Sequence, residues 1–197
     1  MGKDRNRVCP VEHAGSLDAF FRRWLQNPQK ILESYIKEGM AILDMGCGPG
    51  FFSIEMAKMV GPGGRVISAD LQQGMLQKLA RKIKGTELAE RIVLVKCDKD
   101  SINVSEKVDF ILAFYTVHEV PDKEPFFTQL RALLNQEGHF LIVEPKLFHV
   151  SRPEFETTIR LAEDAGFKVY PGPKLFLSWS AILRHEQTTR RSALKNG

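Results

Sequence analysis

Residues that could do chemistry gather in this chain directly after apolar runs, where an open α/β sheet places its ligands. The first group, Asp44 to Gly50, follows one such run and precedes a stretch with helical character. Its three glycines let the backbone approach a ligand at torsion angles that other residues avoid, and the first turn of a new helix offers unpaired N–H groups. This arrangement predicts a cradle for a nucleotide cofactor.

The glycine turn does not fit the dinucleotide fingerprint Gly-x-Gly-x-x-Gly. A pattern started at Gly46 needs glycine where Phe51 stands, and one started at Gly48 needs glycine where Ser53 stands. A nicotinamide-dependent oxidoreductase is therefore disfavoured, although it stays an alternative.

A second carboxylate, Asp70, ends the next apolar run about twenty residues after Gly50, where it can accept hydrogen bonds from both hydroxyls of a ribose. The following residue, Leu71, could flank an adenine ring or pack in the core. Both residues are predicted to lie at the same edge of the sheet as the glycine turn.

Histidine and carboxylate residues follow two later apolar runs. The imidazole of His118 would suit a general base for a hydroxyl, a thiol or an acidic carbon, with Glu119 or Tyr115 nearby. The alternative is that His118 only shapes its loop. Glu144 and His149 follow the next run and are candidates for substrate contact. We therefore predict catalytic or substrate-binding roles for His118, Tyr115, Glu144 and His149.

The acidic residue at the end of the first strand, followed by Gly46-x-Gly48-x-Gly50, resembles motif I of the class I S-adenosylmethionine (SAM) dependent methyltransferases. The resemblance implies that the glycine turn wraps the amino acid end of SAM and that Asp44 lies close to it through water or backbone. It also implies that Asp98, after the third apolar run, accepts the adenine amine. Three neighbouring positions complete the predicted cofactor site: Cys47, as a small filler in the turn, Lys99 and Phe114.

The segment Phe114 to Asp122 resembles the motif after strand 4 in small-molecule methyltransferases of the ubiquinone and menaquinone biosynthesis type. It departs from the Asn/Asp-Pro-Pro-Tyr/Phe motif with which other methyltransferases hold a planar nitrogen, so a nucleobase amine is disfavoured as substrate. The resemblance implies methyl transfer to a small-molecule acceptor. A SAM-binding module without catalysis remains a second alternative.

Regularly alternating apolar runs and amphipathic stretches must position these residues, and they predict the α/β class with a parallel sheet and helices on both faces. The resemblance implies a Rossmann-like, doubly wound sheet of seven strands, mostly parallel with an antiparallel last strand. Only four residues, Pro171 to Lys174, separate the last two strands, too few for a helical crossover. Strands are predicted from Ala41 onward and over 65–70, 92–96, 108–113, 139–143, 167–170 and 175–183, and helices over 73–84, 125–134 and 153–165.

The chain of 197 residues is predicted to form one main domain over 39–185, with an N-terminal helical cover over 1–38 and a basic, disordered tail over 186–197. Two helices are expected in the cover, over 16–26 and 29–38, the second begun by Pro28 with Asn27 as its cap. They would pack on the sheet or form a lid over the substrate.

Composition restricts the remaining classes. No apolar run approaches the length of a membrane span and the N-terminus does not resemble a secretory signal, so we expect a cytoplasmic protein. An odd number of cysteines, three, indicates free thiols. Cys9 and His13 are too few ligands for a metal site, and none is predicted. The net charge of +4 lies mostly near the C-terminus without interleaved aromatic residues, so nucleic-acid binding is not expected. The sequence does not predict an oligomeric state.

Overall fold

The fold is given by a computed structural model, which describes residues 27–146 and 150–186. Several predictions fall outside these residues. They are the helix over 16–26, the possible metal ligands Cys9 and His13, the substrate-contacting role of His149, and the basic tail from 187 onward.

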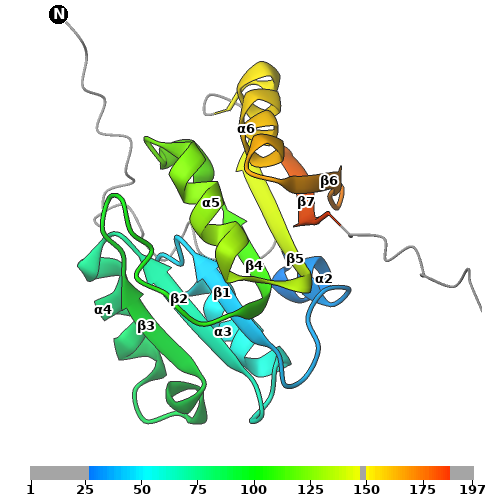
Figure 1. The fold of residues 1–197 in the computed structure, drawn as a ribbon. Coiled ribbons are helices and arrows are strands. Elements are labelled where there is room, and N and C mark those ends of the chain that lie inside the picture. Colours follow the sequence, from blue (N-terminus) through cyan, green and yellow to red (C-terminus); the bar gives the residue numbers. More distant parts are fainter. Residues whose placement is uncertain (1–26, 147–149, 187–197) are drawn as a thin grey trace, which may run out of the picture.

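Seven strands form one sheet in the order β3-β2-β1-β4-β5-β7-β6 (Figure 1). Their bounds are β1 Ala41–Met45, β2 Arg65–Asp70, β3 Ile92–Lys96, β4 Val108–Phe114, β5 Leu134–Pro145, β6 Phe167–Pro171 and β7 Ser178–His185. The first five strands pair in parallel, and β7 pairs antiparallel with both β5 and β6. The predicted doubly wound, mostly parallel sheet of seven strands is confirmed, and β7 is its antiparallel strand.

Helices cover both faces of this sheet (Figure 1). Helices α5 (Lys123–Leu133) and α6 (Arg152–Asp164) lie on one face, and α2 (Pro28–Leu32), α3 (Phe51–Met59) and α4 (Gln73–Ile83) lie on the other. Two short 3₁₀ helices, η2 (Glu87–Glu90) and η3 (Val117–Glu119), complete the described elements. Each face carries its own apolar core, and the central strand β1 is buried on both sides, as parallel strands between two helical layers are. No described helix has the length and apolar character to cross a membrane.

Helix α2 begins as predicted and ends earlier. Pro28 is its first residue, and the Asn27 side chain caps it by accepting from the Lys30 N–H at 3.3 Å. The prediction that the helix extends to residue 38 is wrong, because α2 ends at Leu32. The following turn closes on the same residue, with the Tyr35 N–H donating to the Leu32 carbonyl at 2.9 Å. The Tyr35 ring then stacks on Phe110 of β4 with ring centroids 5.8 Å apart, which directs the chain toward the sheet.

Two strand starts also differ from the prediction. Strand β5 starts at Leu134 rather than at residue 139, because Leu134 already pairs with Val108 before an irregularity in the ladder. Strand β7 starts at Ser178 rather than at residue 175. Leu177 has φ 51°, a left-handed conformation that interrupts the extended backbone of a strand, so residues 175–177 belong to the loop before β7.

The topology brings five connecting segments to one edge of the sheet. The carboxyl ends of β1, β2, β3, β4 and β5 meet there because these strands are parallel. Since β7 runs the other way, its first residue, Ser178, pairs with Pro145 at the end of β5. The loop between β6 and β7 therefore lies beside the residues that follow β4 and β5.

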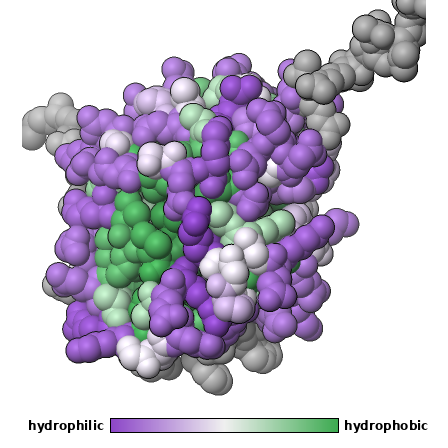
Figure 2. Space-filling model, turned by 60° about the horizontal axis from the view of Figure 1, so that its bottom comes forward, coloured by the Kyte–Doolittle hydropathy of each residue, from purple (hydrophilic) through white to green (hydrophobic). Residues whose placement is uncertain are grey.

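Figure 2 shows a patch of apolar side chains among hydrophilic residues on one face of the molecule. The exposed large apolar residues of the described ranges are Leu71, Val93, Tyr170, Phe176 and Leu177. Leu71 lies at the carboxyl edge directly after β2. Phe176 and Leu177 are neighbours in the chain and lie in the loop before β7.

Candidate active site

The glycine turn after β1 has one side that is open. Gly46, Gly48 and Gly50 all have positive φ, at 72°, 54° and 84°. A Cβ at Gly46 would lie 2.3 Å from Thr116 Oγ1, and one at Gly50 would lie 2.2 Å from Leu79 Cδ1, so these two glycines allow close packing inside the protein. A Cβ at Gly48 would meet no atom within 4 Å. Gly48 is therefore the position where the turn's backbone can lie directly against a ligand.

Asp44 supports the helix that follows the turn. The N-cap residue of α3 is Gly50, which has no side chain to cap with, and the Ser53 hydroxyl in the first helical turn donates to Asp44 Oδ2 at 2.5 Å. Both side chains are buried. Burial raises the pKa of Asp44 to about 7, the Ser53 hydrogen bonds oppose this rise, and the neighbouring Asp70 carboxylate adds to it. Asp44 thus acts from β1 as a cap for α3.

This buried carboxyl predicts an unusual pH dependence of stability. The pKa of Asp44 is about 7 in the folded protein and about 4 in an unfolded chain, so its stabilising contribution is complete below about pH 4 and is lost as pH rises to about 7. Relative to the wild-type protein, Asp44→Asn should therefore gain on the order of 2 kcal/mol in unfolding free energy between pH 5 and pH 8. Urea unfolding at both pH values measures the difference.

Ser53→Ala is the matched variant, because it keeps the carboxyl and removes the hydroxyl that opposes the rise in its pKa. Its stability should fall more steeply with pH than that of the wild-type protein. Parallel stability profiles for the wild-type protein and Asp44→Asn would show that Asp44 does not titrate in this range.

Asp70 connects the end of β2 to the glycine turn. Its carboxylate accepts from the Gly48 N–H at 2.8 Å and from the Gln72 N–H at 2.7 Å. Burial raises the pKa of Asp70, and these two backbone hydrogen bonds oppose the rise. Each carboxylate oxygen has a second lone pair, so Asp70 can still accept from ligand hydroxyls. Leu71 beside it is 39% exposed, which leaves its side chain available to a ring at this edge.

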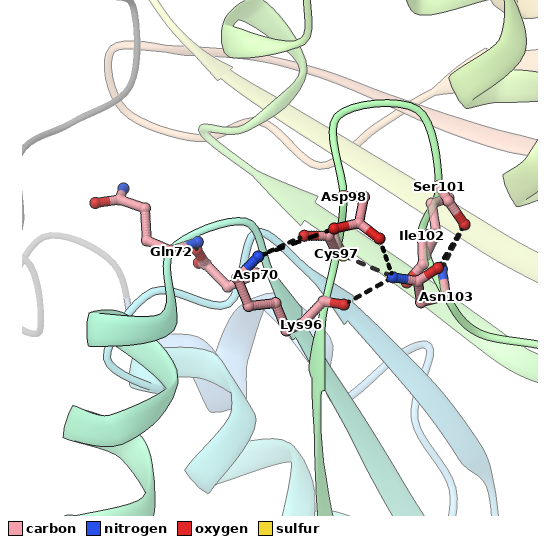
Figure 3. Close-up of polar contacts among 8 residues, drawn as sticks. All are labelled: Asp70, Gln72, Lys96, Cys97, Asp98, Ser101, Ile102 and Asn103. Carbon is pink, nitrogen blue, oxygen red and sulfur yellow. Dashed lines mark hydrogen bonds and ion pairs between the residues drawn. The ribbon is translucent and has the colours of Figure 1, made fainter.

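Asp98 is held by the loop that follows β3, in which Asn103 is the main partner (Figure 3). Asn103, in the left-handed region with φ 58°, donates from Nδ2 to Asp98 Oδ2 at 2.9 Å and to the Lys96 carbonyl at 3.0 Å. The Cys97 N–H donates to the Asp70 carbonyl at 3.0 Å, which fixes the start of this loop against β2. The Asp98 side chain remains 67% exposed, so it is positioned and accessible, and Lys99 is exposed after it.

Cys47 and Phe114 take different places around the turn. The Cys47 side chain is buried in the apolar core, burial raises the pKa of its thiol, and its N–H donates to the Ala69 carbonyl at 3.1 Å. Cys47 therefore fills space beneath the turn. Phe114 is half-buried at the end of β4, with its ring centroid 4.4 Å from that of Phe52 in α3.

The structure joins two residues that the sequence left separate, His118 and Glu144. His118 Nδ1 lies 2.5 Å from Glu144 Oε2, and Glu144 Oε1 accepts from the Val117 N–H at 2.8 Å. Glu144 is the penultimate residue of β5, where its side chain is 2% exposed, and the His118 side chain is 21% exposed. A carboxylate only accepts hydrogen bonds, so the imidazole donates from Nδ1, which leaves Nε2 as its basic nitrogen.

The Tyr115 side chain is hydrogen-bonded to the neighbouring strand β7. Its hydroxyl lies 2.7 Å from Ser178 Oγ at the start of β7, and its backbone has φ 58°. Positive φ in a tyrosine is uncommon and strained, and such residues gather at functional sites. Tyr115 is thus placed next to the dyad formed by His118 and Glu144, with its hydroxyl bonded to β7.

One groove of the described surface lies away from these residues. An open groove of about 660 Å³ runs between α6 and the strands β6 and β7, with Phe155, Tyr170 and Trp179 among its lining residues. It contains none of the predicted site residues. Among the described residues, no group of three or more histidine, cysteine, aspartate or glutamate side chains is arranged to hold a metal ion.

The comparisons with known proteins agree with this geometry. The family model described as "Methyltransferase domain" matches residues 36–171. The chain belongs to this family. A crystal structure of a SAM-dependent methyltransferase from Aquifex aeolicus superposes with a TM-score of 0.79 at 26% identity, covering 89% of this chain and 98% of that one. The predicted membership of the class I SAM-dependent methyltransferases, and SAM as cofactor, are confirmed.

Curated relatives include a demethylmenaquinone methyltransferase from Lactobacillus johnsonii, 31% identical over 137 residues, which are 69% of this chain and 54% of that protein. A ubiquinone/menaquinone biosynthesis C-methyltransferase from Haemophilus ducreyi is 24% identical, over 70% of this chain and 52% of its own length. This methyltransferase chain thus spans about half the length of the curated relatives it matches.

Proposed function

We propose that this methyltransferase domain transfers the methyl group of SAM to a small-molecule acceptor and uses His118 as a general base. The observation that carries the proposal is the dyad of His118 and Glu144, at the same sheet edge as the glycine turn. A buried carboxylate that fixes one imidazole nitrogen orients the other for proton transfer.

The chain's own residues fit the cofactor. The open side of Gly48 lets the backbone approach a ligand, Asp70 offers a carboxylate to ribose hydroxyls, and Asp98 offers one to an adenine amine. Leu71, directly after Asp70, supplies an exposed apolar side chain. When bound, SAM supplies a methyl group on a sulfonium that is electrophilic enough for positioning to provide most of the catalysis.

The dyad would act on the acceptor. Glu144 holds Nδ1 of His118, so Nε2 can take the proton of an acceptor hydroxyl, thiol or acidic carbon as that atom attacks the methyl group. The Glu144 side chain, bonded to Nδ1, then stabilises the imidazolium that results. The Val117 N–H, which donates to the other carboxylate oxygen, keeps Glu144 in place during this step.

For the acceptor class, the names of the two curated relatives point to a quinone precursor. The segment after β4, which resembles the quinone-type motif, supports the same class. Reduced demethylmenaquinone is therefore the first acceptor to test, followed by simple phenols and thiols. We further infer that the protein works in the cytoplasm and that its acceptor is not a nucleic acid.

Cofactor choice is tested by thermal melting in the presence of SAM, its demethylated product S-adenosylhomocysteine (SAH), and NAD. SAM and SAH should raise the melting temperature and NAD should not, because Phe51 and Ser53 occupy the positions where a dinucleotide fingerprint needs glycine. Stabilisation by NAD alone would favour the oxidoreductase alternative.

Gly48→Ala should weaken SAH binding by tenfold or more, since its Cβ would stand in the open space beside the turn. The fold should survive, because that Cβ meets no protein atom and the left-handed backbone costs alanine only about 1 to 2 kcal/mol. Calorimetry with SAH measures the affinity.

Gly46→Ala is the matched control for a structural effect. Its Cβ would collide with the Thr116 side chain, so this variant should lose folding stability even without a ligand. Unchanged SAH affinity in folded Gly48→Ala would remove Gly48 from the binding site.

A further inference from the structure

The loop between β6 and β7 is fastened to the two strands that carry the dyad. The Lys146 N–H, after β5, donates to the Leu177 carbonyl at 2.8 Å. From the end of β4, the Tyr115 hydroxyl meets Ser178 Oγ at 2.7 Å, and that Oγ donates to the Phe176 carbonyl at 3.1 Å. Because serine has one hydroxyl proton, Tyr115 must be the donor to Ser178.

These hydrogen bonds hold two residues in a strained backbone conformation. Tyr115 and Leu177 are both left-handed, with φ 58° and 51°, and each costs about 1 to 2 kcal/mol relative to an ordinary backbone. The loop also leaves Phe176 65% exposed and Leu177 44% exposed, next to each other. Strained backbone that presents apolar side chains to solvent persists only where the surroundings over-determine it, and such sites gather where ligands bind.

The loop between β6 and β7 lies beside the dyad of His118 and Glu144. Ser178 pairs with Pro145, one residue after Glu144, and Tyr115 lies three residues before His118. By contrast, the three residues proposed above to contact the cofactor, Gly48, Asp70 and Asp98, lie at the carboxyl ends of β1, β2 and β3. In the sheet, β7 lies beyond β5, so the apolar pair stands on the side of the dyad away from these three residues, which leaves it open to an acceptor.

We propose that Tyr115 and Ser178 form a latch that holds Phe176 and Leu177 as an apolar wall of the acceptor site. Tyr115 is then a positioning residue whose hydroxyl acts through the loop. The wall packs against an apolar face of the acceptor. This inference rests on the proposed function for its acceptor, whereas the latch itself can be tested without one.

Limited trypsin digestion tests the latch directly, because Lys174 is an exposed cleavage site in the loop. Tyr115→Phe and Ser178→Ala should each speed cleavage after Lys174 by about tenfold or more as the loop opens more often. The double variant should cleave no faster than Ser178→Ala alone, which already removes the bond to Tyr115. Tyr170→Phe, the same chemical change on β6 away from Ser178, should cleave at the wild-type rate. Unchanged cleavage in Tyr115→Phe would overturn the latch.

Kinetics with reduced demethylmenaquinone test the wall. Tyr115→Phe should raise the acceptor KM about tenfold with kcat within about twofold of the wild-type value and SAH affinity unchanged. Phe176→Ser should do the same, and Phe176→Leu should restore most of the loss. Two results would overturn the wall. The first is faster cleavage in Tyr115→Phe with an unchanged acceptor KM. The second is that Phe176→Ser abolishes binding to phosphatidylglycerol vesicles while the acceptor KM stays constant. If the wild-type protein does not methylate this compound, the proposed acceptor class fails, and the digestion still decides the latch.

Discussion

Replacing His118 by asparagine should lower kcat by about a hundredfold or more while SAM affinity stays near the wild-type value, because proton transfer by a positioned base contributes 10²- to 10⁴-fold. The wild-type kcat should rise with pH, because only the unprotonated imidazole can accept a proton from the acceptor. His118→Asn should lose that rise. If His118 only orients the acceptor, KM will increase instead and the pH profile will keep its shape.

Glu144→Gln is the companion variant. It keeps the shape of the side chain and replaces the carboxylate beside His118 Nδ1 with an uncharged amide. It should lower kcat without lowering SAM affinity. Since the two residues act as one unit, the double variant should be little worse than His118→Asn alone. Additive losses in the double variant would show that Glu144 acts separately, for example by holding the Val117 backbone.

The second large effect is expected at Asp70. Asp70→Ala should weaken SAH binding by about 1 to 3 kcal/mol, roughly 5-fold to 150-fold, the range of charge-assisted hydrogen bonds. The same change releases the N–H groups of Gly48 and Gln72, so part of this loss reflects the turn. Isothermal titration calorimetry with SAH measures the affinity, and urea unfolding reports how much stability is lost with it.

Asp70→Asn separates these two contributions. Its amide oxygen can still accept from one backbone N–H, but it carries no charge toward ribose hydroxyls, so affinity should fall more than stability. Asp98→Ala is the comparison at an exposed carboxylate and should cost less affinity. Unchanged SAH affinity in folded Asp70→Ala would exclude Asp70 as a cofactor residue.

The local features of this protein were predictable from its sequence. Strand β2 begins and ends at the predicted residues, and Asn27 caps α2 as expected, since both follow from short-range patterns. The seven strands, mostly parallel with an antiparallel last strand, followed from the resemblance to a known family, whereas the order of the strands was not predicted. The early end of α2 was not predictable in this way, because the stacking of Tyr35 on Phe110 joins residues far apart in the chain.

The site was predictable as a set of positions, but not as a set of pairs. Each strand end was identified, yet the contact between His118 and Glu144 joins residues 26 positions apart and depends on the register of β4 with β5. Ser53 and Ser178 were missed as functional partners because a serine has no distinctive pattern. For Asn103 the sequence offers only a weak indication, namely that asparagine tolerates positive φ in a loop.

One measurement tests the central claim most directly: incubation of the protein with SAM that carries a labelled methyl group, in the presence of reduced demethylmenaquinone, a simple phenol and a thiol. We predict that label enters a small-molecule product, that one SAH forms for each methyl group transferred, and that His118→Asn suppresses both together. SAM that binds without passing label to any of these acceptors, while added RNA or protein becomes labelled, would contradict the account.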